Sequence, residues 1–274
     1  MKQHKIELGG ILFDDIGMID AAKAILLAAK NGTGGFMVTP NAAITHNAMT
    51  DDSFAALLRR AFLTLPDGVG ITAAARLLHT PFAHGRVPGV ELGEVVIRLA
   101  AKAGLSVFFL GGKPGVAQKA AMLLKNRYPS LIVAGTKHGY GIKPESVAKT
   151  IRKSGAKIVF CCLGSPLQEK FAEQLSKTLP APILCLGGSL DIYAENKKRA
   201  PYFVRKLCCE WLWRTLAEPA RAERLPSLFL FFTDILAEKY KKHLQYPYEK
   251  GIIKDNDRTA GLVRARLSNF SKRG

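Results

Sequence analysis

The segment between about residues 105 and 190 alternates short apolar runs with helical patterns, and this alternation constrains the fold more than any other feature. The apolar runs, rich in β-branched and aromatic residues, cover 106–110, 131–134, 157–163 and 182–186. The helical patterns between them run over about 114–128, from about Pro144, and over about 166–179. Strands and helices that alternate at this spacing form βαβ units, and near-continuous apolar strands are buried on both faces. The segment therefore predicts a parallel sheet covered by helices.

The flanking segments extend this pattern on one side and end it on the other. Helical patterns cover about 21–30, 52–62 and 89–103, and a strand is predicted over 35–39. After Asp191 the strands stop, and helical patterns follow over about 201–218 and 226–244. We expect an α/β core over 1–195 with a mostly parallel sheet and helices on both faces. A helical appendage over 196–245 and a charged tail over 246–274, of a composition typical of disorder, complete the chain.

Net charge narrows the choice of partners. The 274 residues carry a formal charge of +18, which predicts attraction to nucleic acid, an acidic membrane leaflet or phosphorylated substrates.

The sequence shows neither a membrane span nor a secretory signal. No stretch approaches the roughly 18 to 20 consecutive apolar residues of a spanning helix. The apolar stretch after Lys5 is broken by Asp14 and Asp15, unlike the core of a secretory signal, so we expect a cytosolic protein. The five cysteines have neither zinc-site spacing nor an even count, so we expect ordinary thiols and no metal site.

Polar or glycine-rich sequences follow several of the strands. In open parallel sheets ligands bind at the carboxyl ends of the strands, where helix N-termini present unpaired N–H groups. These sequences are Thr39-Pro-Asn41, Pro66-Asp-Gly68, Gly111-Gly112, Gly164-Ser-Pro-Leu-Gln-Glu169 and Gly187-Gly-Ser-Leu-Asp191. The glycine pairs allow a backbone to approach a diphosphate closely, although tight turns alone would also explain them. The spacing of Gly111, Gly112 and Gly115 does not fit the dinucleotide fingerprint. The P-loop does not fit either, because Lys113 is followed by Pro114 instead of Ser or Thr.

Asp67 is the candidate general base. It stands between Pro66 and Gly68 at a strand end, where a rigidly held carboxylate can accept a proton from an attacking hydroxyl. The alternative is an ordinary turn, because Pro-Asp-Gly is a common turn sequence. Taken alone, the residues leave both interpretations open.

Eight motifs, in order, settle which family the chain resembles. They are Thr39-Pro-Asn41, Pro66-Asp-Gly68, Arg86-Val-Pro-Gly-Val-Glu91, Phe109-Leu-Gly-Gly112, Gly164-Ser-Pro-x-Gln-Glu169, Gly187-Gly-Ser-x-Asp191, Arg199-Ala-Pro201 and Glu210-Trp-Leu-x-Arg214. This series closely resembles the WecG/TagA/CpsF family of bacterial glycosyltransferases (glycosyltransferase family 26) over roughly residues 8 to 240.

The resemblance implies a Rossmann-like catalytic core and an inverting, metal-independent reaction without a cofactor. The implied donor is a UDP-sugar carrying N-acetylmannosamine, its uronic acid or another hexose. The implied acceptor is an undecaprenyl-diphosphate-linked glycan at the cytoplasmic face of the membrane, in cell-surface polysaccharide or capsule synthesis. Inversion is a direct displacement through an oxocarbenium-like state, so it requires one base and a cationic or dipolar cradle for the leaving group.

The resemblance also implies roles for individual residues. Asp67 matches the base, and Gln168 and Asp191 match catalytic positions near the donor sugar and the acceptor. Pocket-lining and diphosphate-binding positions are matched by Thr39, Asn41, Arg86, Gly111, Gly112, Glu169, Gly187 and Gly188. A surface salt bridge would also explain Arg86, and an N-cap would explain Asp191. The family often has a basic residue where Leu167 stands and an aromatic one where Leu190 stands, which leaves the donor sugar open.

The appendage over 196–245 combines basic residues with aromatic and aliphatic ones, as an interfacial segment requires. The resemblance implies that it attaches a peripheral enzyme to the anionic membrane surface. It also implies that Arg214, Arg221 and Arg224 complete the site over the leaving diphosphate. The alternative is a helical hairpin packed on the core with a solvated basic face.

Two other function classes are compatible with the composition. The charge would suit a nucleic-acid-binding module, but no helix-turn-helix or RNA-recognition signature is present, so no nucleic-acid partner is expected. A nucleotide-sugar oxidoreductase or epimerase would suit the alternating pattern, but it requires the dinucleotide fingerprint that the chain lacks. The sequence leaves the oligomeric state open.

Overall fold

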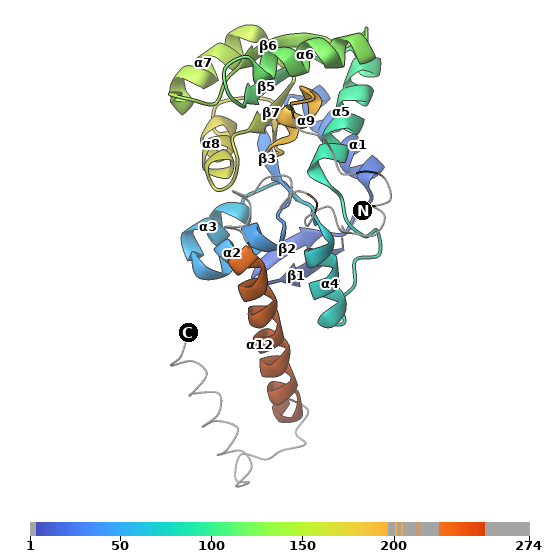
Figure 1. Ribbon diagram of the computed structural model, residues 1–274, viewed down its shortest axis with the longest axis vertical. Coiled ribbons are helices and arrows are strands. Elements are labelled where there is room, and N and C mark those ends of the chain that lie inside the picture. Colours follow the sequence, from blue (N-terminus) through green and yellow to red (C-terminus); the bar gives the residue numbers. More distant parts are fainter. Residues whose placement is uncertain (1–3, 197–200, 202–203, 205–212, 214–224, 250–274) are drawn as a thin grey trace.

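The computed structural model describes residues 4–196, 201, 204, 213 and 225–249, with side chains in the last helix described for 226–240. Its centre is a six-stranded parallel sheet with the order β4-β3-β8-β7-β5-β6 (Figure 1). The strands are β3 (Gly35–Val38), β4 (Leu63–Thr64), β5 (Val107–Gly111), β6 (Val133–Lys137), β7 (Ile158–Cys162) and β8 (Pro182–Cys185). The predicted α/β class and parallel sheet are confirmed.

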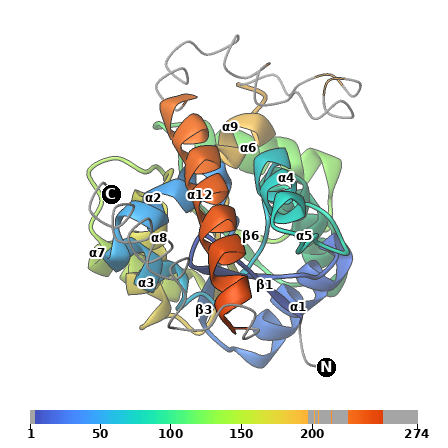
Figure 2. The same ribbon diagram turned by 90° about the horizontal axis from the view of Figure 1, so that it is seen from below.

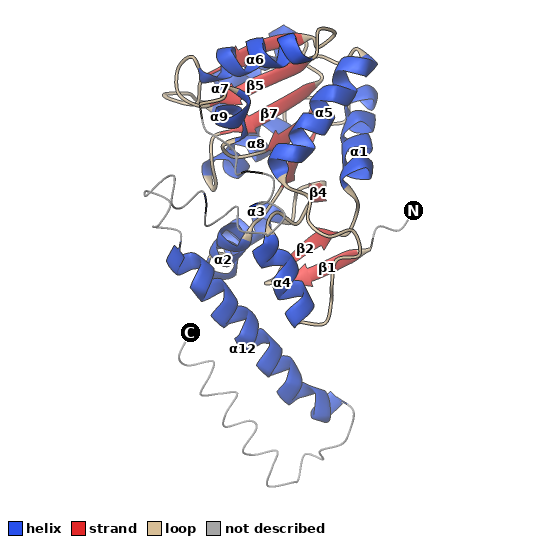
Figure 3. Ribbon diagram, turned by 45° about the vertical axis from the view of Figure 1, so that its right-hand side comes forward, coloured by secondary structure: helices blue, strands red, loops and turns tan. Residues whose placement is uncertain are grey.

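Helices cover both faces of this sheet, as Figure 3 shows. One face packs against α1 (Met18–Asn31), α5 (Gly89–Ala103), α6 (Val116–Arg127) and α9 (Ser189–Tyr193). The other packs against α2 (Ala42–Thr50), α3 (Asp52–Leu58), α7 (Pro144–Ser154) and α8 (Leu167–Ser176). Strand residues alternate between the two cores: Phe108 and Leu110 join one, and Val107 and Phe109 the other. The sheet is therefore buried on both sides, as its apolar strands require.

An N-terminal β-hairpin, which the sequence pattern did not predict, lies outside the main sheet. Strands β1 (Lys5–Leu8) and β2 (Ile11–Asp14) pair in antiparallel fashion. The two-residue turn between them, Gly9-Gly10, has positive φ at both positions, which glycine adopts without strain. In Figure 1 the hairpin lies below the sheet together with α2, α3 and α4 (Val69–Leu77). It adds apolar side chains to the core shared with α4.

Most predicted helices agree with the structure to within a few residues. Several boundaries differ by three residues or more. Helix α1 begins at Met18 rather than at residue 21, and β6 covers Val133–Lys137 rather than 131–134. Helices α3 and α8 end at Leu58 and Ser176 rather than at residues 62 and 179, and the last helix, α12 (Leu225–Glu249), continues into the predicted tail. The register with β5 begins at Val133, although Ile132 O already accepts the N–H of Val107, and the chain after Leu58 turns toward β4. Strand β4 is the short strand predicted before Asp67, whereas helices α2 and α4 have no counterpart in the sequence prediction, because both are short.

Helix α12 (Leu225–Glu249) is the described part of the appendage, and it packs on the core. Figure 2 shows it lying across α2 and α4. Phe231 and Ile235 are fully buried there, and the ring nitrogen Nδ1 of His46 in α2 lies 3.0 Å from Asp234 Oδ2. None of the described helices is long and apolar enough to cross a membrane. The predicted helix over 201–218 lies largely outside the described residues.

Candidate functional site

The loops that the sequence singled out all leave the same edge of the sheet. Because the six strands are parallel, their carboxyl ends meet at one edge, in the order set by the strands. From β4 to β5 along this edge come Asp67, Thr39, Gly187, Gln168 and Gly111. Neighbouring strands are about 4.8 Å apart, so six strands span roughly 24 Å. That length accommodates an extended ligand.

Asp67 is held at the junction of three segments. Its N–H donates to Pro40 O over 3.1 Å, and the N–H of Val87 donates to Pro66 O over 2.7 Å. Its carboxylate Oδ2 accepts the N–H of Gly89, the first residue of α5, over 3.3 Å. The positive end of the α5 dipole stabilises a negative charge at that point. Asp67 is partly exposed, so the structure positions a supported carboxylate at the surface of this edge.

Gly89 makes the approach of α5 to Asp67 sterically feasible. A Cβ atom on this residue would lie 2.9 Å from Thr39 Oγ1 and 3.7 Å from Asp67 Oδ2. Thr39 itself is buried, and its hydroxyl donates to Cys185 O over 3.4 Å. Thr39, Asp67 and the N-terminus of α5 are therefore brought together, as expected of one site.

Asn41 and Arg86 lie on the same half of the edge. Asn41 is the N-cap of α2, because its Oδ1 accepts the N–H of Ile44 over 3.1 Å. Its Cβ lies 4.0 Å from the position that a Cβ on Gly68 would take, so it is a neighbour of the Asp67 loop. Arg86 is partly buried in the segment that precedes α5.

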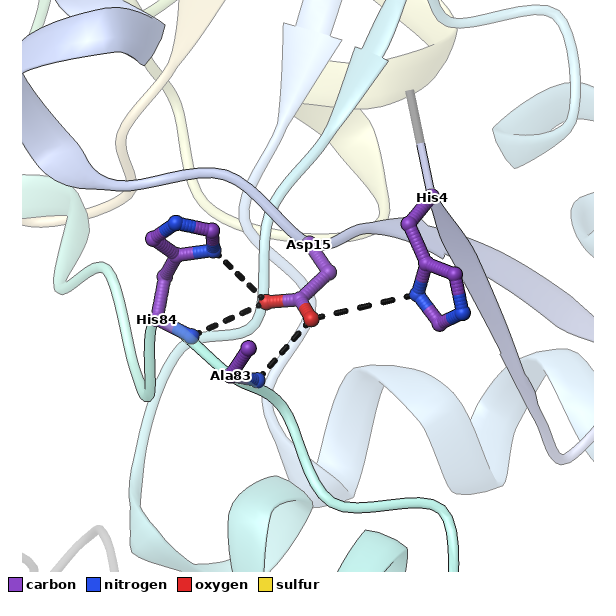
Figure 4. Close-up of polar contacts among 4 residues, drawn as sticks. All are labelled: His4, Asp15, Ala83 and His84. Atoms are coloured by element: carbon purple, nitrogen blue, oxygen red, sulfur yellow. Dashed lines mark hydrogen bonds and ion pairs between the residues drawn. The ribbon is translucent and has the colours of Figure 1, made fainter. Parts of the chain in front are cut away.

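The end of the N-terminal hairpin anchors both segments that flank Asp67. Asp14 Oδ2 accepts the N–H of Thr64 in β4 over 2.8 Å, and its Oδ1 lies 3.1 Å from Lys5 Nζ. Thr64 is three residues before Asp67. Asp15 points toward the other segment, which leads to Arg86 (Figure 4). Two adjacent carboxylates therefore fix the two chain segments from which Asp67 and Arg86 extend.

Asp15 is ionised in an environment rich in donors. Its carboxylate accepts the N–H of Ala83 over 2.9 Å and that of His84 over 3.1 Å, and the His84 ring nitrogen Nδ1 lies 3.3 Å away (Figure 4). The His4 ring lies 3.9 Å from the other side. Burial alone would raise the pKa of Asp15, but the hydrogen bonds from Ala83 and His84 outweigh it and hold the pKa below its usual value.

The other half of the edge is built around Gln168, which is 3% exposed in the first turn of α8. Its side-chain Oε1 accepts the N–H of Gly187 over 2.8 Å, which joins the loop after β7 to the loop after β8. Its Nε2 donates to Glu169 Oε1 over 2.9 Å. Glu169 is 1% exposed, and its contact with this half of the edge is the hydrogen bond from Gln168.

The glycine loops and Asp191 complete this half. Gly111 has φ of 136°, and a Cβ there would collide with Cys162 O, so only glycine fits. Gly188 is the N-cap of α9 and Asp191 lies inside that helix, so the N-cap interpretation of Asp191 is wrong. Burial raises the pKa of the Cys162 thiol to about 12, with Asp191 as a further contribution. Asp191 is thus a neighbour of the β7 end.

Several expected site residues lie outside this description. Arg214, Arg221 and Arg224 fall outside the described residues. Of the two positions that depart from the family pattern, Leu167 is 52% exposed beside Gln168, whereas Leu190 is fully buried in the core. Leu190 therefore does not line the surface of the site.

Comparison with known proteins decides the family. The model of the "Glycosyl transferase WecG/TagA/CpsF family" matches residues 6–245, most of the chain. The chain belongs to this family. It is therefore a glycosyltransferase, and the resemblance inferred from the eight motifs is confirmed.

Curated WecG/TagA/CpsF relatives extend over almost the same length. Proteins of Staphylococcus aureus strains NCTC 8325 / PS 47 and COL are each 33% identical over 241 residues, 86% of this chain and 94% of the relative. The protein of strain MRSA252 matches to the same extent. All three are named N-acetylglucosaminyldiphosphoundecaprenol N-acetyl-β-D-mannosaminyltransferase.

Sequence reasoning missed two features that lie beside the candidate site. Asp14 and Asp15 appeared in the sequence only as interruptions of an apolar stretch, and their anchoring role depends on tertiary contacts with Thr64, Ala83 and His84. Tyr140 was also missed: it follows edge strand β6, is 58% exposed, and stands between Gly139 and Gly141. The N–H of Gly139 donates to Gly112 O over 2.9 Å, which ties this loop to the Gly111-Gly112 loop.

Proposed function

We propose that the chain transfers N-acetylmannosamine, or a closely related sugar, from UDP to an undecaprenyl-diphosphate-linked acceptor. The name of the S. aureus relatives supports the transferred sugar and the acceptor. The observation that carries the proposal is the carboxylate of Asp67, which the N-terminus of α5 supports at the edge where all the candidate loops meet. Such a carboxylate suits the base that an inverting transfer requires.

The donor would lie along the edge with its nucleotide over β5 and β6 and its sugar toward Asp67. The Gly111-Gly112 and Gly187-Gly188 loops offer close backbone approach to the diphosphate. The exposed ring of Tyr140, at the far end of the edge, offers a stacking face for a base. The strand spacing places the β4 end and the β6 end roughly 24 Å apart, enough for a nucleoside, a diphosphate and a sugar in a row.

Each chain residue then has a defined task in the displacement. Asp67 accepts the proton of the acceptor hydroxyl while that oxygen attacks the anomeric carbon. Arg86, on the segment joined to Asp67 through Val87 and Pro66, neutralises the negative charge that develops on the departing diphosphate. Gln168 and Asp191, at the ends of β7 and β8, orient the sugar. Displacement in one step inverts the anomeric configuration.

Helix α12 supports a peripheral position at the membrane. One side of it, with Phe231 and Ile235, is buried on the core. Another side exposes Phe229, Leu236 and Tyr240, with exposed fractions of 71%, 52% and 44%, at helical spacing that places them on one stripe. An exposed apolar stripe on a strongly basic chain fits the interface of an anionic bilayer.

The test is transfer by the purified full-length chain, with a panel of UDP-sugars and a synthetic lipid-diphosphate N-acetylglucosamine acceptor. We expect a product mass equal to acceptor plus one N-acetylhexosamine, with the β anomeric configuration by NMR. Asp67→Asn should lower kcat roughly 10²- to 10⁴-fold and leave UDP binding almost intact. The matched control is Asp20→Asn, an exposed aspartate on α1, which should not change kcat. Near-normal turnover of Asp67→Asn would remove Asp67 from the mechanism.

A further inference from the structure

Gln168 has an orientation that the surrounding donors and acceptors determine. The N–H of Gly187 lies 2.8 Å from the side-chain oxygen Oε1, and since a backbone N–H only donates, that atom must be the carbonyl oxygen. The amide nitrogen Nε2 therefore faces Glu169 Oε1, 2.9 Å away. The main-chain oxygen of Gln168 is held as well, by the thiols of Cys161 and Cys185 at 3.8 and 3.7 Å.

Glu169 lies in surroundings that disfavour a charged carboxylate. It is 1% exposed, and none of the ion pairs in the described part of the chain includes it. Glu173, one turn later on α8, differs: it lies 2.8 Å from Arg60 and 3.7 Å from Lys177. The Ser165 hydroxyl is a further hydrogen-bond partner of the Glu169 carboxylate, and both groups are buried. Taking an ionised carboxylate out of water is still costly, because neither Gln168 nor Ser165 carries a positive charge.

The burial of Glu169 favours its protonated form. With the proton on Oε2, the carboxyl group is neutral and Oε1 still accepts the N–H of Gln168 Nε2. Burial raises the pKa of Glu169, in spite of hydrogen bonds from Gln168, from its own backbone N–H and from Ser165, which act in the opposite direction. Gln168 Nε2 has two hydrogens, and the bond to Glu169 uses one of them. The second hydrogen is not used by the bond to Glu169.

We propose that Glu169 is a positioning residue that fixes the Gln168 amide, so that its second N–H is presented to the bound sugar-diphosphate while its oxygen holds the Gly187 loop. The proposal rests on the proposed function, because it supplies the donor for that reaction. Glu169 neither touches the substrate nor transfers a proton. Its chemistry is that of a hydrogen-bond acceptor, which glutamine reproduces and an apolar side chain does not.

Three variants test this. Glu169→Gln keeps a carbonyl oxygen for Gln168 Nε2, so kcat should stay within about threefold and the pH profile of kcat should not move. Glu169→Met has a similar volume without an acceptor, so kcat should fall roughly 10- to 100-fold with a smaller change in KM. Glu173→Gln, on the same helix and away from Gln168, is the control for a changed charge on α8.

A double-variant cycle separates positioning from general structural support. If Glu169 acts through Gln168, then Gln168→Ala combined with Glu169→Met should be no slower than Gln168→Ala alone. Additive losses would overturn the proposal, because they would mean that Glu169 acts independently. Loss of activity in Glu169→Gln together with loss of one limb of the pH profile would also overturn it, since Glu169 would then be the titrating group.

A readout that needs no turnover keeps this inference distinct from the proposed function. The side-chain amide of Gln168, followed by NMR in ¹⁵N-labelled protein, should show slowed hydrogen exchange in the unaltered chain and in Glu169→Gln but not in Glu169→Met. Fast exchange in the unaltered chain would overturn the positioning role even if transfer is normal. Slow exchange in an unaltered chain that transfers no UDP-sugar would count against the proposed function and still support the hydrogen bond.

Discussion

Asp15 and Glu169 are both buried carboxyl groups that hold neighbouring parts of the candidate site, yet their surroundings move their pKa values in opposite directions. Asp15 receives two backbone N–H groups and faces the rings of two histidines, and these donors outweigh its burial. Glu169 receives hydrogen bonds only from uncharged groups, the Gln168 amide, its own backbone N–H and the Ser165 hydroxyl, and there burial prevails. The comparison shows that the two halves of one edge use different chemistry: the donors around Asp15 favour its charged form, whereas the burial of Glu169 favours its neutral form.

The largest expected effect is on the Asp67 half. Asp15→Ala would leave the N–H groups of Ala83 and His84 without their acceptor, and the segment leading to Arg86 would lose its anchor. We expect kcat to fall roughly 10- to 100-fold, because small misplacements of a catalytic segment are costly. The free energy of unfolding should fall by about 3 kcal/mol. Enzyme kinetics and urea unfolding measure the two effects.

The control for Asp15→Ala is Asp51→Ala. Asp51 also accepts two backbone N–H groups, those of Ser53 and Phe54, but it caps α3 away from the site. The control should lower stability less and leave kcat unchanged. If both variants slow the reaction equally, the hairpin has no special relation to Asp67.

The next prediction compares the stability of two variants in which Asp15 or Glu169 is replaced by its isosteric amide. Asp15→Asn places an NH₂ group against a backbone N–H, so we expect it to lower the free energy of unfolding by about 2 kcal/mol near pH 7. Glu169→Gln removes no charge-assisted bond, so the change should be less than about 1 kcal/mol. Chemical denaturation of both variants provides the measurement. Equal losses would mean that Glu169 is ionised like Asp15, and the proposed difference between the two carboxyl groups would be wrong.

The pH dependence of the free energy of unfolding should also differ between Asp15 and Glu169. Because the folded pKa of Asp15 lies below the unfolded value, its contribution is present above the unfolded value of 3.8 and is lost as pH falls through the folded pKa. Because the folded pKa of Glu169 lies above 4.5, its contribution is present below 4.5 and is lost as pH rises through the folded pKa.

The two amide variants should therefore diverge from the unaltered chain at opposite ends of the pH range. The deficit of Asp15→Asn should shrink as the solution becomes acidic. Glu169→Gln should become relatively more stable as it becomes alkaline. Melting temperatures measured across the range provide the test, and parallel curves for all three chains would contradict it.

The sequence predicted the sheet and the loops of the site far better than it predicted their supports. Continuous apolar strands and glycine pairs are local signals, so β5, β7, β8 and the loops after them could be placed from the residues alone. The hairpin that carries Asp14 and Asp15 is only a few residues long on each side, and its strands bury alternate side chains against α4, which no local pattern reveals. The burial of Glu169 is likewise tertiary, since the neighbouring Leu167 in the same motif is exposed.

The smallest expected effect concerns the attachment of α12, which packs beside the Asp67 half of the candidate site. Among the described residues, α12 contacts α2 and α4, the elements that follow the Thr39 and Asp67 loops, through Phe231, Ile235 and the pair of His46 with Asp234. Asp234→Asn should weaken this attachment by only about 0.5 kcal/mol, because the Asp234 side chain is 40% exposed and solvent screens the pair. The loss should shrink further in high salt. Because α12 packs beside the Asp67 half, the variant should reduce kcat slightly and leave slow exchange of the Gln168 amide unchanged. A larger effect on the amide than on kcat would show that α12 acts on both halves of the site.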